Sequence, residues 1–341
     1  MLDNRKKRIL QAIIEEYIGT AEPVSSASII QNYDINFSSA TIRNEMSDLE
    51  KNGYLEKPHT SAGRIPSAKG YRFYVDELLK DDNLSFDEVR YINKMLQSRA
   101  NEMEDLTKIA THTLSEITHY TSVALGPKTA NHIIIDIKFV LLGTRVLMAV
   151  ILTDTGMIKE SIIKFDSDIT QLQVENLNYI FNMKLRGKSL GQIDLPMEEF
   201  IRSEMNCELK IIKPIIQEIN KAVESSNEIY LEGRDKVFDF PEFSDLVTAK
   251  NLLKILDTKE LVSSILNSGT TQYINVYIGN ENAYDELKNL SVITFRNVLE
   301  DKDLGTIGII GPTRMDYSKV ISVMKYIKKE LNDKWSKMGD I

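Results

Sequence analysis

The sequence is poor in the residues that build disulfides, metal centres and membrane spans. Its single cysteine, Cys207, excludes an intramolecular disulfide and a cysteine-based zinc cluster, and it indicates a reducing compartment. The four histidines show no metal-ligand spacing. The longest apolar stretch, Phe139 to Leu152, is interrupted by Thr144-Arg145 and is too short to span a bilayer. The first helical stretch is charged and lacks a continuous apolar run, so we expect no signal peptide and a cytoplasmic protein.

The chain also lacks an excess of positive charge, since its formal net charge is −8. Residues 1–80 carry 11 Lys/Arg against 11 Asp/Glu, so the rest of the chain holds the whole negative excess. Local clusters, rather than total charge, decide whether a protein binds phosphates. Two such clusters stand in the neutral part: Arg5-Lys6-Lys7-Arg8, and residues 57–72, which have four Lys/Arg, His59 and no acid.

Residues 38–57 have the pattern of a DNA-reading helix followed by a wing. Ser38-Ser39 are good N-cap residues, Ile42, Met46 and Leu49 form one apolar stripe, and Gly53 is placed to end the helix. A short strand from Tyr54 to Lys57 and a loop of small and basic residues follow. At about 100° per residue, the opposite face of the helix carries Ala40, Asn44, Ser47 and Lys51, flanked by Thr41 and Arg43.

Side chains on this helix and wing are candidates for DNA contact. Arg can bond guanine, and Asn can bond adenine, in a bidentate way, so Arg43 or Asn44 reads bases; which of the two does so stays open. Ser39 and Thr41 are expected to bind phosphate with the amides of the helix start. The full predicted contact set is Ser39, Thr41, Arg43, Asn44, Ser47, Lys51, His59, Ser61, Arg64, Lys69 and Arg72.

The wing tip and the first basic cluster each leave two interpretations open. His59, Thr60, Ser61, Gly63 and Arg64 would form the tip, with Gly63 allowing a tight turn. Arg64 would enter a minor groove or pair with phosphate; the alternative is a mobile polar loop. Arg5 to Arg8 would touch backbone phosphates, or would be a solvated helix end.

The rest of the chain alternates between helical and strand periods, which predicts a multidomain α+β protein. Helices are expected from Asp3 to about Tyr17 and from Ser25 or Ser26, and one long helix is expected from Phe86 to Tyr120. Residues 80–85 are the best linker candidate. Further helices are predicted at 67–79, 169–186, 197–205, 211–223, 249–266 and 317–331, and strands at 132–165 (three strands), 228–231, 273–278, 292–298 and 306–310.

The sequence does not contain the motifs that are typical of nucleotide-binding enzymes. Residues 63–70 (GRIPSAKG) do not satisfy the phosphate-loop motif, and Gly305, Gly308 and Gly311 are spaced as glycines of a strand. No residue set indicates a ligand. We therefore expect no catalytic residues, no cofactor and no metal.

Two segments carry a resemblance to a known family. RKKRILQAIIEEYIGTAEPVSSASI with SSATIRNEMSDLEKNGYLEKPHTSAGRIPSAKGYRFYVDELL, within residues 5–79, and LGTIGIIGPTRMDYSKVI at 304–321 resemble the heat-inducible transcription repressor HrcA of bacteria. The resemblance implies a winged helix-turn-helix domain, a GAF-like domain, and an inserted dimerisation domain with a small antiparallel sheet and helices. It also implies repression of chaperone genes through an inverted-repeat operator, the CIRCE element.

The resemblance places the domains at 1–84 (winged helix), 85–128 with 226–341 (GAF-like) and 129–225 (insert). In an alternative division the strands at 132–165 belong to the GAF-like sheet, and only the helices are inserted. The implied partners are double-stranded DNA, a second copy of the chain and the chaperonin GroEL, which would keep the repressor active until heat inactivates it. No membrane and no small-molecule effector are expected. The rival function is a ligand-sensing GAF-domain regulator or a GAF-like enzyme with an N-terminal interaction domain.

Overall fold

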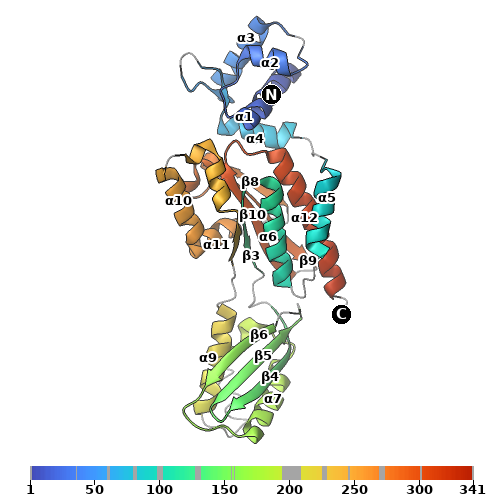
Figure 1. Cartoon of the computed structure of the whole chain (residues 1–341), viewed down its shortest axis with the longest axis vertical. Coiled ribbons are helices and arrows are strands. Elements are labelled where there is room, and N and C mark those ends of the chain that lie inside the picture. The colour runs from blue at the N-terminus through green and yellow to red at the C-terminus, as the bar shows by residue number, and fades with distance from the viewer. Residues whose placement is uncertain are drawn as a thin grey trace.

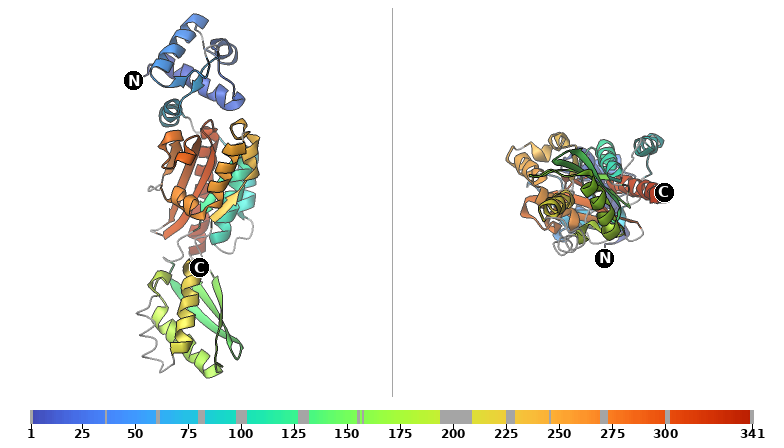
Figure 2. Two further views of the ribbon diagram at one scale, coloured as in Figure 1. Left: turned by 90° about the vertical axis from the view of Figure 1, so that its left-hand side faces the viewer. Right: turned by 90° about the horizontal axis from the view of Figure 1, so that it is seen from below.

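Three units lie in a row along the molecule (Figure 1, Figure 2). The computed structural model describes residues 2–35, 37–59, 62–79, 83–97, 103–126, 132–154, 156, 158–193, 209–224, 229–244, 246–268, 273–299 and 302–339. We call the units the N-terminal unit (2–79), the central unit (83–126 with 229–339) and the distal unit (132–224). They combine helices and sheets, as predicted. Among the described helices, none has both the length and the hydropathy needed to cross a bilayer.

The N-terminal unit is helical with one small hairpin. The predicted helix starts are confirmed, because Asp3, Ser25 and Ser38 each accept a hydrogen bond from a backbone amide of the first turn. The first helix ends at Thr20, later than expected, because it continues through Gly19. The elements are α1 (Asn4–Thr20), α2 (Ser26–Asn32), α3 (Ser39–Lys51), β1 (Leu55–Glu56), β2 (Ile65–Pro66), α4 (Ala68–Phe73) and the π-helix η1 (Tyr74–Leu78).

The central unit is a five-stranded antiparallel sheet with helices on both faces. The strand order is β7-β3-β10-β9-β8. Helices α5, α6 and α12 pack on one face, and α10 and α11 on the other. The strands are β3 (Thr121–Leu125), β7 (Ile229–Glu232), β8 (Ile274–Ile278), β9 (Leu290–Leu299) and β10 (Lys302–Pro312). The helices are α5 (Phe86–Gln97), α6 (Met103–Thr118), α10 (Leu246–Asp257), α11 (Lys259–Asn267) and α12 (Tyr317–Gly339).

The prediction of one long helix from Phe86 to Tyr120 is wrong. Helices α5 and α6 pack against each other, so the chain reverses between them. The apolar spacing is helical in both, and periodicity alone does not reveal a reversal. Strand β3, directly after α6, was missed because all five of its residues are buried and give no alternation.

The distal unit has its own sheet and its own core. Strands β4 (Ile134–Gly143), β5 (Val146–Thr153) and β6 (Ile158–Lys164) form an antiparallel meander, and α7 (Gln171–Leu185) and α9 (Leu209–Glu224) cover one face. Asn178 and Asn182 of α7 bond the backbone of Phe139 and Ile137, at 2.5–3.1 Å. These amides close the β4 edge, which would otherwise be a template for another strand.

The distal unit interrupts the central sheet between two paired strands. Leu125 of β3 pairs with Ile229 of β7, and the chain between them builds the distal unit. Among the described residues, β4, β5 and β6 form a sheet of their own, separate from the central sheet. The domain borders at 128/129 and 225/226, and the helix at 197–205, lie outside the described residues, so they stay predictions.

Candidate nucleic-acid interface

Helix α3 is held by its predicted apolar stripe and turns a polar face outward. Ile42, Met46 and Leu49 are buried against α1 and α2, at no more than 4% exposure. Burying these side chains fixes the rotation of the helix about its axis. Arg43 and Asn44 are exposed as a result. Lys51 is exposed on the same side and Ser47 is half-buried there.

The start of α3 is fastened to α2 by hydroxyl groups. The Ser39 hydroxyl lies 3.3 Å from the Ser26 hydroxyl, and the Thr41 hydroxyl lies 2.9 Å from that of Ser38. The first contact joins the N-terminal end of α2 to that of α3, and the second lies within the cap of α3. Two short helices packed on each other in this way are consistent with a helix-turn-helix. Ser39 and Thr41 thus lie where the first turn of α3 presents its free amides.

The hairpin after α3 is anchored on the segment before α2. Leu55 pairs with Pro66 and Glu56 with Ile65, and Arg64 forms a backbone bridge to Val24 with bonds of 2.8 and 2.9 Å. Lys57 and His59 are exposed in the hairpin loop. Predicted contact residue Ser61, with Thr60, lies outside the described residues.

Arg64 fastens the hairpin to α3 and does not extend toward solvent. A terminal nitrogen of its guanidinium lies 2.7 Å from the Glu50 carboxylate, and its side chain is 18% exposed. A phosphate would compete with Glu50 for this guanidinium. Arg64 therefore has a partner inside the protein, which could not be predicted from its basic neighbours in the sequence.

Two other predicted contact residues also have partners within the protein. Lys69 donates to the Asn52 carbonyl at 2.9 Å and lies 4.5 Å from the centre of the Tyr54 ring. Arg72 binds Glu281 of the central unit, at 2.9 Å from Nε. The placement of Arg72 on the DNA face is corrected, because its guanidinium is held at the boundary between units.

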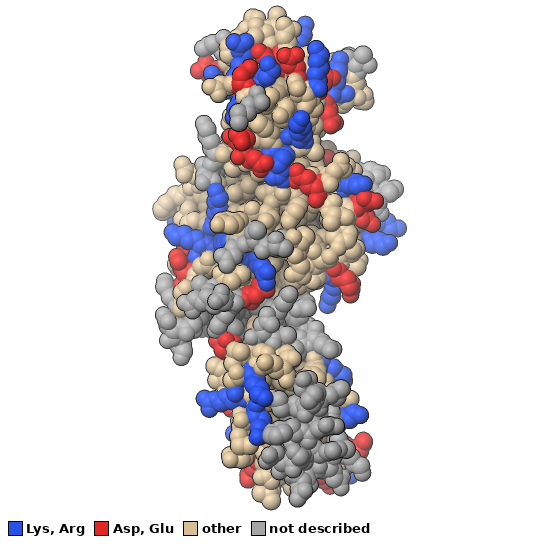
Figure 3. All heavy atoms as spheres, turned by 180° about the vertical axis from the view of Figure 1, so that it is seen from behind, with Lys and Arg blue, Asp and Glu red and all other residues tan. Residues whose placement is uncertain are grey.

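Basic side chains of the described N-terminal unit differ in whether they have a partner inside the protein. The described unit has ten Lys and Arg residues, and charges of both signs intermingle on its surface in Figure 3. Arg43, Lys51 and Lys57 have no hydrogen-bond or ion-pair partner among the described residues. The other seven, each bonded to a carboxylate or a carbonyl, are Arg5, Lys6, Lys7, Arg8, Arg64, Lys69 and Arg72.

The three unpartnered cations belong to α3 and the hairpin. A hollow of about 310 Å³ between these elements is lined by Arg43, Lys57 and Arg64. Lys57 was not in the predicted contact set, although it begins the basic stretch 57–72. An exposed cation without an acid beside it is available to a phosphate at little desolvation cost.

The basic cluster at the start of α1 is engaged inside the unit. Arg5 and Lys6 pair with Glu45 of α3 at 3.3 and 2.8 Å. Arg8 donates to the Asp34 carbonyl at 2.8 Å. These bonds give the cluster a role in packing α1 against α3, on the flank of α3 away from the hairpin.

Gly63 is required by the close approach of the hairpin to Val24. A Cβ at this position would lie 2.3 Å from the Val24 carbonyl oxygen. Gly63→Ala should therefore separate the two segments and lower the free energy of unfolding by about 1–3 kcal/mol. Thermal unfolding and DNA affinity measure the effect.

Gly19→Ala is the matched control for this prediction. A Cβ at Gly19 in α1 would meet nothing within 4 Å. Alanine has the higher helix propensity, so this variant should unfold at the same or a higher temperature. Equal stability of the two variants would contradict the proposed need for glycine at position 63.

Comparison with known proteins points to the same family as the two sequence segments described above. A family model described as HrcA protein C terminal domain matches residues 104–321. The heat-inducible transcription repressor HrcA of Acetivibrio thermocellus is 40% identical over 336 residues, which cover 97% of this chain and 96% of the relative. The one of Ruminiclostridium cellulolyticum is 39% identical over 346 residues, covering 100% and 99%.

A solved structure shares the fold. The crystal structure described as a hypothetical protein at 2.2 Å resolution matches with a TM-score of 0.72 and 24% identity, over 99% of this chain and 100% of that one. At this identity the match concerns the fold alone. The family model and the nearly full-length relatives together show that this chain belongs to the family of heat-inducible transcription repressors HrcA.

Proposed function

We propose that this chain is a homodimeric, sequence-specific repressor of heat-shock genes. It binds an inverted-repeat operator, the CIRCE element of its family, upstream of chaperone operons, in the cytoplasm. The name of its relatives, heat-inducible transcription repressor, supports the class of genes. The observation that carries DNA contact is the set of three cations, Arg43, Lys51 and Lys57, which share one face and lack a partner among the described residues.

The three units take the roles expected from the family. Residues 1–84 form the winged helix-turn-helix, with α3 as recognition helix and the hairpin as wing. Residues 85–128 with 226–341 form the GAF-like domain, and 129–225 the inserted dimerisation domain. The support lies in the α2–α3 arrangement, in the hairpin anchored at Val24, and in the separate sheet of the distal unit.

Helix α3 enters the major groove and the wing follows the backbone. Arg43 and Asn44, in the first turns of α3, reach base edges, while Ser39 and Thr41 contact phosphate with the amides of the helix start. Along the rest of the interface, Ser47 and Lys51 continue the α3 face, and Lys57, His59 and Ser61 lie on the wing. Arg64 holds the wing in place through Glu50.

The open face of the distal sheet forms the dimer interface. It faces the viewer in Figure 1, with α7 and α9 on its other side. Val140, Met148 and Ile162 are cross-strand neighbours on this face, and Val140 and Ile162 are 38% and 60% exposed. Such an apolar row on a sheet marks an interaction surface.

The charges on the same face suit a second copy of the chain. Lys138 and Glu160 flank Val150 across the three strands, and both are exposed. A two-fold axis near Val150 would bring Lys138 of each copy to Glu160 of the other. Asn178 and Asn182 occupy the hydrogen-bonding groups of the β4 edge. A second copy would therefore pack on the open face of the sheet rather than pair with that edge.

Heat relieves repression by lowering the fraction of folded, DNA-competent dimer, and GroEL restores that fraction. Two features support this step. Strands β3 and β7 pair with each other although the whole distal unit lies between them in the sequence. Pairing of such distant segments is slow and leaves strand edges exposed during folding. No described element of the monomer covers the open distal face, and exposed apolar surface of this kind is what a chaperonin would bind.

Binding to duplex DNA as a function of salt tests the proposal. The chain should bind an inverted-repeat operator more tightly than a scrambled duplex of the same composition. Lys57→Ala should weaken both complexes and reduce the slope of log affinity against log salt by about one, because each phosphate contact releases about one counterion.

Lys69→Ala is the matched control, since Lys69 already donates to the Asn52 carbonyl. It should leave the salt slope unchanged. Equal affinity for operator and scrambled duplex would refute sequence-specific repression. Equal slopes for the Lys57 and Lys69 variants would refute the assignment of Lys57 to the DNA face.

A further inference from the structure

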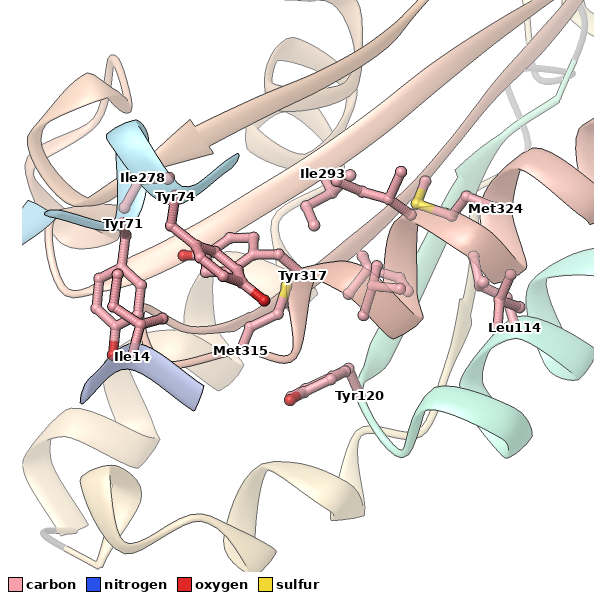
Figure 4. Packing of buried hydrophobic residues seen from close by; sticks show 14 of the residues in the cluster. Ile14, Tyr71, Tyr74, Leu114, Tyr120, Ile278, Ile293, Met315, Tyr317 and Met324 are labelled. Atoms are coloured by element: carbon pink, nitrogen blue, oxygen red, sulfur yellow. The ribbon is translucent and has the colours of Figure 1, made fainter. Parts of the chain in front are cut away.

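The N-terminal unit shares a core with the central unit. Tyr71 of α4 and Tyr317 of α12 are 2% and 0% exposed, and their ring centroids lie 5.7 Å apart. Ile14 and Tyr74 of the N-terminal unit lie beside them, with Met315 on the central side (Figure 4). Burial of this kind resists separation of the units, so the DNA-binding face has a defined direction relative to the central sheet.

Arg72 fixes one side of this contact. Its Nε and one terminal nitrogen bind the two oxygens of Glu281 at 2.9 and 2.5 Å, and the same terminal nitrogen donates to the Val276 carbonyl at 2.5 Å. Glu281 lies in the turn η6 (Gly279–Glu281), directly after β8, and also accepts from the Ile278 amide at 2.9 Å. A bidentate fork of this type restricts orientation as well as distance.

Arg314 fixes another side from the opposite direction. It belongs to the central unit, and it donates at 3.0 Å to the carbonyl of Ile18 in the last turn of α1. Its Nε binds Glu242 at 2.5 Å, and its side chain is 12% exposed. The Ile18 carbonyl is one of those that a helix end leaves without an internal partner, so Arg314 also caps α1.

These contacts constrain rotation between the units. One arginine of each unit donates a hydrogen bond to a backbone carbonyl of the other unit. Between these two contacts, Tyr71 packs on Tyr317. A body held at three separate points has one orientation. In a dimer that orientation sets the distance and angle between the two α3 helices, which must match the separation of the operator half-sites.

We propose that Arg72 and Arg314 are positioning residues that set the half-site spacing this repressor accepts. The inference rests on the proposed function, because spacing has meaning only for a dimer on an inverted repeat. It assigns specificity to residues that touch no DNA. It also gives Arg72 a role different from the direct DNA contact expected from its basic sequence context.

A series of operators with altered spacers tests the inference. The inverted repeat is prepared with its natural spacer and with spacers changed by one to five base pairs, together with a duplex that holds one half-site. The wild-type chain should prefer the natural spacer. Arg72→Ala and Arg314→Ala should each lose about tenfold in affinity on it and less on the other spacers, while half-site affinity stays within about twofold.

Charge reversal and a matched ion pair provide the controls. Arg72→Glu combined with Glu281→Arg should recover part of the spacer preference, whereas Arg72→Lys should not, because lysine lacks the fork. Lys7→Ala should behave as wild type, since Lys7 pairs with Glu77 inside the N-terminal unit. Unchanged thermal unfolding verifies that each variant is folded.

Three outcomes would overturn the inference, and they differ from one another. If half-site affinity falls as much as operator affinity in Arg72→Ala, Arg72 contacts DNA directly. If the spacer profile of both arginine variants equals that of the wild type, the contacts between units do not set spacing. If the wild-type chain itself binds all spacers and the scrambled duplex equally, the proposed function fails first.

Discussion

Replacing Ile162 by glutamate is expected to turn the proposed dimer into monomers. Operator binding should then weaken about 100- to 10,000-fold, because the second half-site no longer adds its avidity. Ile162 is 60% exposed and pairs with Met148 in the middle of the open distal face. In a sheet-on-sheet interface its carboxylate would be buried without a partner. Analytical ultracentrifugation measures the dimer, and titration of operator DNA measures the affinity.

Leu172→Glu is the control for this prediction. Leu172 is 67% exposed, like Ile162, but it lies on α7, which packs on the other face of the sheet. This variant should remain a dimer with unchanged operator affinity. Monomers from Leu172→Glu and dimers from Ile162→Glu would place the interface on the helical side instead.

Arg43→Ala and Asn44→Ala are expected to cost about 1–3 kcal/mol each in operator binding, with little loss on random DNA. Both side chains are exposed on α3, Asn44 on the face opposite Ile42 and Met46 and Arg43 on its flank. A bidentate contact to a base edge is lost only where the matching base is present. Competition titrations at constant salt, with operator and random duplexes, separate the two losses.

Asn32→Ala serves as the matched control for Asn44. Asn32 is exposed at the C-terminal end of α2, away from the start of α3. Its loss should change neither affinity. If the Arg43 variant loses the same binding free energy on operator and random DNA, Arg43 contacts phosphate. Base reading would then be assigned to Asn44 or to another residue.

Local structure followed closely from local sequence. The caps Asp3 and Ser38, the buried stripe Ile42–Met46–Leu49 and the end of α3 before Gly53 all have the positions expected of them. These features depend on neighbours three to four residues away, which the sequence displays directly. Strands β4, β5 and β6 were likewise predictable, because they are apolar, β-branched runs separated by turn residues.

Contacts between distant segments could not be predicted in this way. Glu50 as partner of Arg64, and Glu281 as partner of Arg72, lie at sequence separations that no periodic pattern connects. The sequence shows four basic residues in 57–72 but not which of them is already paired. The reversal between α5 and α6 was hidden for the same reason, since both helices show one continuous apolar period.

The sequence by itself determined the helices of the N-terminal unit, the face that α3 exposes and the family to which two of its segments are similar. Only the tertiary structure decided which cations remain available on that face and that Arg72 belongs to the boundary between units. It also decided that no described helix covers one side of the distal sheet. The physical reason is that charge is a property of a residue, whereas availability depends on what the folded chain brings within about 4 Å of it.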